Sequence, residues 1–283
     1  MPPALSPVTL TVSIVTYQPD LALLERCLLS LAMALDTARD GGILRDANVV
    51  LVDNTGSRAT AEAVVHLGEE RFKGSGVTMN YLHRHTNIGY GSAHNLVMHG
   101  GNTHYHLVLN PDVELAPDAI IAGLAFLNEH PEIGVLAPEV SAPDGKREFL
   151  CKRYPAVLDL ALRGFAPAAV RRCFRGRLDR FEMRDAIRSA SGFVSPVPVM
   201  SGCFMLARRK AVDATGGFDP GYFLYFEDFD WSVRLNKVAG SAYVPAVRIV
   251  HHGGGAAQKG WRHIAWFAKS AARFYRKHGW KWT

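Results

Sequence analysis

The sequence lacks several features that would place it in a special class of protein. It has no uninterrupted run of about 18 apolar residues, which a membrane-spanning helix requires, and its first residues lack the basic and apolar blocks of a secretion signal. Its cysteines have no paired spacing, so neither a disulfide framework nor a zinc knuckle is expected: Cys27, Cys151, Cys173 and Cys203. Internal repeats and low-complexity tracts are also missing. We therefore expect a folded, cytoplasmic protein with free thiols.

The composition is that of a globular chain with an excess of positive charge. Of the 283 residues, 48% are hydrophobic and 20% are charged, and the formal net charge is +6. This length is sufficient for one domain with a large core. The basic residues gather in 155–195 and 256–283, where they would attract phosphate or form solvated helix faces. Residues 1–7 contain three prolines and are expected to form a flexible tail.

Apolar strands alternate with helical segments in the first half of the chain. Runs rich in β-branched or aliphatic residues predict strands at 9–17, 48–52, 78–82, 105–109 and 133–137. Helices are expected between them, including one that starts at Pro117 and reaches Asn128. Such alternation predicts a mainly parallel sheet with helices on both faces, which is an α/β doubly wound unit.

The pattern changes after Pro138. Residues 159–191 alternate apolar side chains with arginines and predict a basic insertion that is helical or mobile. Residues 196–206 are expected to be extended, 241–250 to form two short strands, and 261–278 to form a basic amphipathic helix. That helix carries tryptophans among lysines and arginines, so it would lie on a membrane surface or pack against the core.

Polar residues follow four of the predicted strands, at the edge of the sheet where ligands of α/β proteins bind. They are Thr16 and Tyr17, Asp53 and Asn54, Asn87 and Gly89, and Asn110 and Asp112. Each set alone could be an ordinary turn, but four together predict a binding edge. Asp112 offers the oxygen that Mg²⁺ or Mn²⁺ prefers, and His251 or His252 is either a further ligand or a core histidine. The glycines near Asn87 would let the backbone approach a ligand closely.

Three carboxylates directly follow an aromatic stretch, residues 222–226. Glu227, Asp228 and Asp230 would be costly to bury without partners. They either form a charge cluster at the start of a helix or face a cleft. In an aromatic-lined cleft, desolvation would raise the pKa of a carboxyl group, which suits a general base. Arg234 could pair with an acid or with phosphate, and Gly202 brings a small residue close to the same cleft.

Taken in order, these motifs resemble the family 2 inverting glycosyltransferases, and in particular their bacterial rhamnosyltransferase branch. The motifs are Val-Ser-Ile-Val-Thr-Tyr, Val-Asp-Asn, Asn-x-Gly-x-Gly-x-x-x-Asn, Asn-Pro-Asp, Gly-Gly-Phe-Asp, Phe-Glu-Asp-x-Asp and a late His-His-Gly-Gly. The resemblance implies a GT-A fold, a Rossmann-like sheet flanked by helices. Residues 8–255 would form this domain, with a nucleotide-binding half (8–137) and a catalytic and acceptor half (138–255), followed by a C-terminal helix within 256–283.

The resemblance also implies a function and a set of site residues. A sugar would move from a nucleotide-diphosphate donor, dTDP-rhamnose before a UDP-sugar, to a hydroxyl of a saccharide or lipid-linked acceptor in cell-surface polysaccharide synthesis, such as that of O-antigen. Asp228 would be the general base with Glu227 beside it, and Glu227, Asp230, Trp231 and Arg234 would face the acceptor. Asp112 with His251 or His252 would hold Mg²⁺ or Mn²⁺. The donor would bind to Thr16, Tyr17, Asp53, Asn54, Asn87, Gly89, Asn95, Asn110, Asp112 and Gly202.

Nucleic acid is not expected as a partner, whereas the basic segments would bring the enzyme to the inner face of the plasma membrane. Two other functions stay open. A nucleotide-sugar-binding module without turnover is disfavoured by the intact Glu227 and Asp228 pair. A nucleotide-dependent oxidoreductase is disfavoured because the glycine fingerprint that begins at Gly89 is incomplete, with His94 in place of its third glycine.

Overall fold

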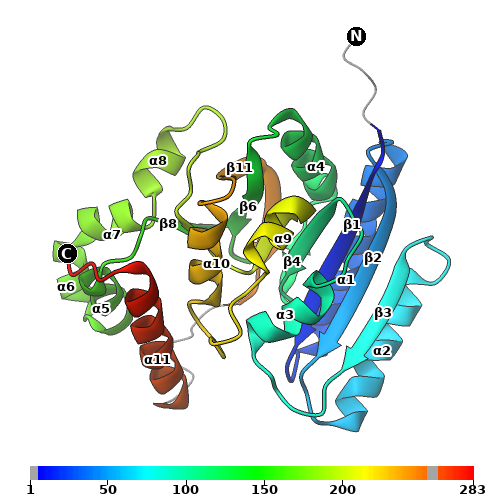
Figure 1. Cartoon of the computed structure of the whole chain (residues 1–283), viewed down its shortest axis with the longest axis horizontal. Helices are drawn as coiled ribbons and strands as arrows, with labels where there is room; N and C mark the ends of the chain where they lie inside the picture. The colour runs from blue at the N-terminus through cyan, green and yellow to red at the C-terminus, as the bar shows by residue number, and fades with distance from the viewer. Residues whose placement is uncertain (1–5, 254–260) are drawn as a thin grey trace.

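The computed structural model describes residues 6–253 and 261–283, and its centre is a mixed sheet flanked by helices (Figure 1). Of the residues predicted to form a flexible tail, 1–5 lie outside the described residues, as do 254–260. The nine-stranded sheet has the order β3 (Thr78–His83), β2 (Leu44–Asp53), β1 (Val8–Thr16), β4 (Tyr105–Leu109), β10 (Phe204–Arg208), β6 (Ile133–Ser141), β11 (Gly240–His251) and β5 (Val113–Leu115), with β7 (Arg147–Glu148) paired to β6. Two further strands, β8 (Cys151–Lys152) and β9 (Val199–Met200), pair separately.

The sheet is mainly parallel, as the alternation of strands and helices predicts. β1 pairs in parallel with β2 and β4, and β2 pairs in parallel with β3. β10 then runs antiparallel between β4 and β6, so that β6 points the same way as β4. The predicted strands at 9–17, 48–52, 78–82, 105–109 and 133–137 are confirmed, although β2 begins earlier and β6 ends later.

Helices cover both faces of the sheet because the side chains of each strand alternate. In β1, Leu10 and Ile14 belong to the core under α1 (Leu21–Asp40), α2 (Arg58–Phe72) and α4 (Ala119–Glu129). Ser13, between them, points to the other face, where its hydroxyl lies 2.7 Å from His94 of α3 (Tyr90–Met98). The carboxyl ends of these strands therefore meet at one edge, where α3 begins.

Two predicted boundaries differ from the structure. Helix α4 begins at Ala119 and not at Pro117. Asp118 stands at the N-cap position, but its carboxylate makes no capping hydrogen bond and pairs instead with Arg248 of β11 at 2.8 Å. Residues 241–250 form one strand instead of two. Pro245 has no N–H to donate, and the pairing with β6 shifts register between Val244 and Arg248 without ending the strand.

The basic insertion is helical. It forms α5 (Val157–Phe165), α6 (Ala168–Cys173), α7 (Arg175–Phe181) and α8 (Arg184–Ser189). Many of its arginines form internal ion pairs, such as Arg177 with Asp159 at 2.6 Å and Arg184 with Glu182 at 2.6 Å. Much of this positive charge is therefore neutralised within the protein.

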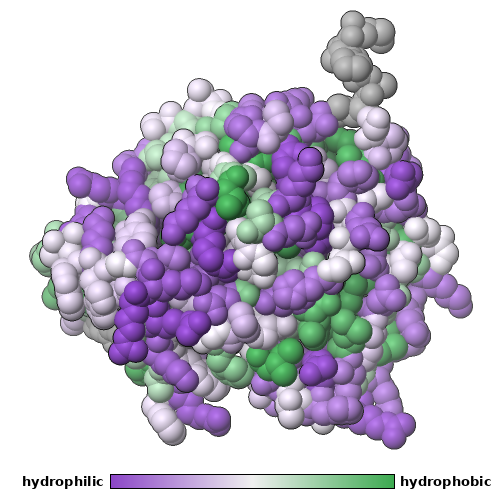
Figure 2. All heavy atoms as spheres, viewed as in Figure 1, coloured by the Kyte–Doolittle hydropathy of each residue, from purple (hydrophilic) through white to green (hydrophobic). Residues whose placement is uncertain are grey.

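The C-terminal helix α11 (Trp261–His278) packs beside α10 (Glu227–Leu235), while α9 (Arg209–Thr215) covers the sheet nearby (Figure 1). Phe274 and Tyr275 of α11 are buried against Tyr222 and Phe226. On the opposite side of this packing, the surface over α11 is largely hydrophilic (Figure 2). No helix within the described ranges combines the length and the apolarity that crossing a bilayer demands.

Candidate active site

The aromatic stretch turns sharply just before the carboxylates. Tyr225 and Phe226 both have left-handed backbones, with φ of +69° and +64°. For residues other than glycine this costs about 1–3 kcal/mol each. The packing of Phe226 compensates for that strain, since its ring lies 5.1 Å from that of Phe267 and 5.5 Å from that of Phe274 in α11. The turn buries the aromatic rings under α11 and starts α10 at Glu227.

Asp228 is held by two backbone N–H groups. Gly202 donates to Oδ2 at 3.0 Å, and Phe229 donates to Oδ1 at 2.9 Å. The side chain is partly exposed, yet its surroundings still desolvate it and raise its pKa, while the two N–H groups act in the opposite direction. Asp228 is therefore an anion with a raised proton affinity, which is the property of a general base near neutral pH.

Glu227 lies deeper than Asp228. It is buried, and its Oε2 accepts no hydrogen bond from the described residues. Burial raises its pKa, and the negative charge of Asp228 raises it further. Both carboxyl groups therefore have a raised pKa, and Glu227 is raised by burial and by the charge of its neighbour together.

Tyr90 connects Asp228 to the end of β4. Its hydroxyl lies 2.7 Å from the carbonyl oxygen of Gly202 and 2.9 Å from Oδ1 of Asn110. Burial and the charges of Glu227, Asp228 and Asp112 raise the pKa of Tyr90 well above its ordinary value, so the phenol stays neutral. Tyr90 therefore lies between Glu227 and Asp228 of α10 and Asp112 after β4. Sequence reasoning missed Tyr90, although an aromatic residue between two glycines at a strand end was a usable signal.

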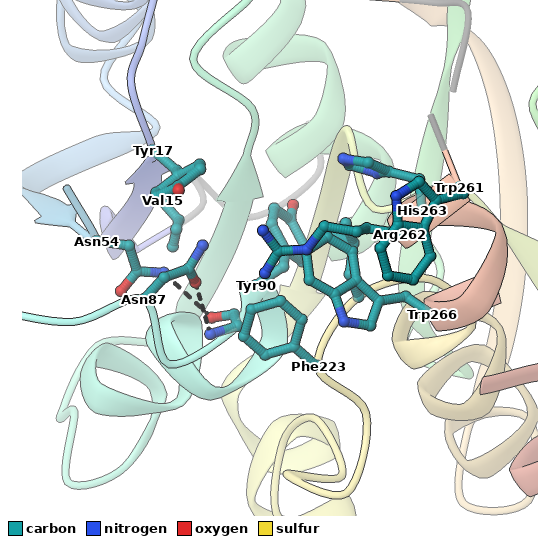
Figure 3. Close-up of a pocket in the computed structure, with 12 residues that line it drawn as sticks. Val15, Tyr17, Asn54, Asn87, Tyr90, Phe223, Trp261, Arg262, His263 and Trp266 are labelled. Carbon is teal, nitrogen blue, oxygen red and sulfur yellow. Dashed lines mark hydrogen bonds between the residues drawn. The ribbon is translucent and has the colours of Figure 1, made fainter. Parts of the chain in front are cut away.

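A pocket of about 580 Å³ opens beside Tyr90 (Figure 3). Of the residues predicted to bind the donor, Tyr17, Asn54, Asn87 and Gly89 line it. These side chains come from the ends of β1 and β2 and from the loop before α3. The structure therefore brings this part of the predicted set together.

Hydrogen bonds shape the loop that borders this pocket. Asn54 donates from Nδ2 to the carbonyl oxygen of Gly89 at 3.2 Å, and Asn87 accepts the Gly89 N–H at 2.9 Å. Gly89 has a φ of +92°, and a Cβ there would lie 2.5 Å from the carbonyl oxygen of Phe223. Only glycine permits this approach. Oδ1 of Asn54 is buried and accepts no hydrogen bond from the side chains or backbone that the structure describes.

The other six residues of the predicted donor set do not line this pocket: Asn110, Asp112 and Gly202 lie around Tyr90 and the end of β4, and Thr16, Asp53 and Asn95 bind other parts of the protein. Asp53 is fully buried and accepts from the hydroxyl of Thr16 and the N–H of Thr55, both at 3.0 Å. Asn95 exchanges two hydrogen bonds with the backbone of Phe218, at 2.7 and 2.9 Å. These contacts fix the strand ends and the turn before the aromatic stretch.

Most of the predicted acceptor side is also internal. Asp230 and Trp231 have no exposed surface. Asp230 pairs with Arg234 of its own helix at 2.7 Å and with Lys277 and His278 of α11 at 2.8 and 2.7 Å. These partners outweigh the effect of burial and lower the pKa of Asp230. The contacts are those of a brace between α10 and α11.

Asp112 and His251 form a pair that suits a divalent cation. Nε2 of His251 lies 3.6 Å from Oδ1 of Asp112, an atom that accepts no hydrogen bond from the described residues. A Cβ at Gly253 would lie 2.6 Å from Oδ2 of Asp112 and 2.6 Å from Nε2 of His251, so glycine keeps this space open. Glu148 lies 3.5 Å from the other ring nitrogen of His251. Mg²⁺ or Mn²⁺ would take its other ligands from water and phosphate.

His252 points elsewhere. Its imidazole contacts Glu114, and only its backbone N–H reaches Asp112, donating to the carbonyl oxygen at 2.9 Å. No group of three or more His, Cys, Asp or Glu side chains able to hold a metal occurs in the described part of the chain. Of the two histidines, His251 is the one beside Asp112.

No protein-family model matches the chain. Two curated relatives, from Mycobacterium tuberculosis strains CDC 1551 / Oshkosh and ATCC 25618 / H37Rv, are each 31% identical over 261 residues. The match covers 86% of this chain and 76% of theirs, and both are named N-acetylglucosaminyl-diphospho-decaprenol L-rhamnosyltransferase. This chain belongs to the rhamnosyltransferase branch of the family 2 glycosyltransferases. A further member, rhamnosyltransferase WbbL of Escherichia coli K12, is 44% identical over 54 residues, which are 18% of this chain and 20% of that protein.

Two solved glycosyltransferases confirm the GT-A fold of this family member. GalNAc-T7 with UDP, GalNAc and Mn²⁺ has a TM-score of 0.60 at 15% identity, over 90% of this chain and 45% of that one. Mannosyltransferase PcManGT of Pyrobaculum calidifontis, with GDP-Man and Mn²⁺, has a TM-score of 0.60 at 17% identity, over 95% of this chain and 65% of that one. The chain thus spans under half of one neighbour and about two thirds of the other. It is a glycosyltransferase that transfers a sugar in polysaccharide synthesis.

Proposed function

We propose that the enzyme transfers rhamnose from dTDP-rhamnose to a hydroxyl of a lipid-linked saccharide, with inversion at the anomeric carbon. The observation that carries this proposal is the position of Asp228, held by backbone N–H groups and joined through Tyr90 to the end of β4 beside the pocket. The Mycobacterium tuberculosis relatives, named for a rhamnosyl product on a diphospho-decaprenol acceptor, support the sugar and the acceptor class.

In the proposed reaction, Asp228 removes the proton from the acceptor hydroxyl as its oxygen bonds to the anomeric carbon. The bond between that carbon and the donor diphosphate breaks in the same displacement, and its electron pair leaves with the diphosphate. Because one displacement inverts the configuration, no covalent bond forms between sugar and protein. The raised pKa of Glu227 disfavours a second negative charge near the base.

Asp112 and His251 are the residues that would hold a divalent ion, and both solved neighbours contain Mn²⁺. Such an ion, when bound, would neutralise charge on the departing diphosphate. Oδ1 of Asp112 has no hydrogen-bond donor among the residues that the structure describes, and this atom and the space kept by Gly253 support this assignment.

Asn54 is a residue that would contact the donor nucleotide. It lines the pocket, and its Oδ1 has no donor among the described residues. A buried acceptor without a partner costs about 1–3 kcal/mol, so an N–H of the nucleotide base would be a suitable partner. The choice of dTDP as the donor nucleotide follows from the rhamnosyl transfer in the names of the relatives.

The experiment that tests the function combines binding with transfer. The purified protein is titrated with dTDP, UDP, GDP and NAD(P), with and without Mn²⁺, and then given dTDP-rhamnose and a polyprenyl-diphospho-N-acetylglucosamine acceptor. We expect dTDP binding that Mn²⁺ strengthens and a rhamnosylated product of inverted configuration. Preferential binding of NAD(P) would contradict a transferase, and nucleotide binding without any product would favour a binding module.

We also propose that the enzyme works on the inner face of the plasma membrane through α6 and the C-terminal end. Val170 of α6 and Phe174, which directly follows this helix, are exposed, and no ion pair within the described residues involves Arg171 or Arg172 between them. Trp282 is 64% exposed, and its backbone oxygen accepts the N–H of Leu158 in the adjacent α5. Exposed apolar and basic side chains of this kind bind anionic lipid surfaces. Failure to sediment with anionic vesicles at low salt would argue against this contact.

A further inference from the structure

The pocket beside Tyr90 has a second wall that comes from the other end of the chain. Tyr17 and Asn54 lie on one side, and Arg262 and Trp266 from the first turns of α11 lie on the other (Figure 3). The sequence predicted α11 to lie on a membrane or to pack on the core, and neither role involves the pocket. The structure therefore gives this helix a position that its own periodicity does not indicate.

Arg262 is placed to meet a ligand in this pocket. Its guanidinium lies 5.6 Å from the centre of the Trp266 ring and extends from α11 across the pocket toward Asn87 (Figure 3). Stacking on an aromatic ring orients a guanidinium while its N–H groups stay available for hydrogen bonds. No ion pair of Arg262 occurs within residues 6–253 and 261–283. It is also the one arginine or lysine among the described residues that line the pocket.

The negative charge around the pocket favours a cation at the position of Arg262. The acids Asp112 and Asp228 both act on Tyr90, which lines the same pocket. A nucleoside diphosphate adds at least two further negative charges, and acids alone would repel it. A guanidinium matches two phosphate oxygens with parallel N–H groups, which an ammonium group cannot do.

The position of α11 is fixed by contacts with the chain segment that forms the floor of the pocket. Ser270 donates to the carbonyl oxygen of Leu224 at 2.8 Å, and the hydroxyl of Tyr225 lies 2.8 Å from Nδ1 of His263. The rings of Phe223 and Trp266 lie 4.9 Å apart. A residue supported in this way presents its charge at a defined place, as a binding site requires.

We propose that α11 forms the second wall of the donor pocket and that Arg262, supported by Trp266, binds the diphosphate of the nucleotide sugar. This inference rests on the proposed function, because it takes the ligand of the pocket to be a nucleoside diphosphate. It assigns to the C-terminal helix a part in donor binding in addition to its packing against α10.

The test measures nucleotide affinity by calorimetry, with thymidine and dTDP as paired probes. The variants are Arg262→Ala, Arg262→Lys and, as the matched control, Lys269→Ala, which removes an exposed cation of the same helix outside the pocket. We expect Arg262→Ala to weaken dTDP binding by about 10- to 100-fold, the value of a lost charge-assisted hydrogen bond, and to leave thymidine binding unchanged. Arg262→Lys should recover part of the loss, and Lys269→Ala should bind as the native protein does.

The measurement is repeated in EDTA, where the effect of Arg262→Ala should persist because it does not pass through a metal. Equal affinity of native protein and Arg262→Ala for dTDP would overturn the inference and leave the proposed function intact. Equal losses for thymidine and dTDP would also overturn it, since the change would then act on the base or on the fold. Native protein that binds no nucleoside diphosphate would overturn the proposed function itself.

Discussion

Replacing Asp228 with Asn removes the proposed base while it keeps the size of the side chain. In the native protein each carboxylate oxygen accepts one backbone N–H, from Gly202 at 3.0 Å and from Phe229 at 2.9 Å. The amide of Asn can accept only one of these, and its own N–H₂ would face the other donor. One unsatisfied N–H costs about 1–3 kcal/mol, so Asp228→Asn should still fold.

The loss in catalysis should be much larger than the loss in stability. General-base catalysis contributes about 10²- to 10⁴-fold, or about 3–5 kcal/mol of barrier. Single-turnover transfer from dTDP-rhamnose, followed by mass spectrometry of the product, measures this rate, and calorimetry with dTDP measures donor binding. We expect transfer to fall by that factor while the Kd for dTDP changes by less than about threefold. Asp213→Asn, at an exposed acid of α9, is the control and should match the native enzyme.

The pH dependence gives a second measure of the same group. Because burial raises the pKa of Asp228, the native rate should fall on acidification at a higher pH than an ordinary aspartate would give. This acid limb should disappear from the residual activity of Asp228→Asn. Residual transfer above about a tenth of the native rate, or parallel loss of transfer and dTDP binding, would refute the assignment of Asp228 as the base.

Three further changes test the surroundings of the base. Glu227 has a raised pKa in the folded protein, so its contribution to stability is lost as pH rises through that pKa. Glu227→Gln should therefore flatten the fall of the unfolding free energy with pH. An unchanged slope of unfolding free energy against pH would contradict this. Tyr90→Phe removes the hydroxyl that contacts Gly202 and Asn110. We expect about tenfold slower transfer with native dTDP affinity. A native rate of transfer would show that the hydroxyl does not position the base. Asp230→Asn removes the buried carboxylate that pairs with Arg234 and Lys277 and contacts His278, and it should lower the unfolding free energy by about 3 kcal/mol in urea titrations; no loss would show that these contacts do not hold α11.

Much of the fold could be predicted because the signals are local. The β-branched run of β1 and the helical spacing of α11 each lie within a short window, and both elements appear in the structure where the sequence predicts them. The edge strand β5, with three residues, has no such signal, because it depends on pairing with β11, more than a hundred residues later.

The site could be predicted only in part, for the same reason. Residues at strand ends, such as Asn54 and Asn87, meet because parallel strands end at one edge. The sequence does not show that the carboxylate of Asp53 is already occupied by Thr16 and Thr55, since those hydrogen bonds depend on tertiary distances. The periodicity of a helix indicates which face is buried but not its partner, so the position of Arg262 over the pocket could not be foreseen.

The contacts of Asp230 with Lys277 and His278 have a consequence for how this enzyme can be altered. Asp230 lies two residues after Asp228 on α10, and the helix that neutralises it is the one that carries Arg262. A truncation before α11 would leave Asp230 with Arg234 as its one cationic partner among those described above, close to the end of α10 that carries Asp228, and would also open the pocket. Chimaeras that exchange C-terminal segments between relatives should therefore exchange α10 and α11 as one unit.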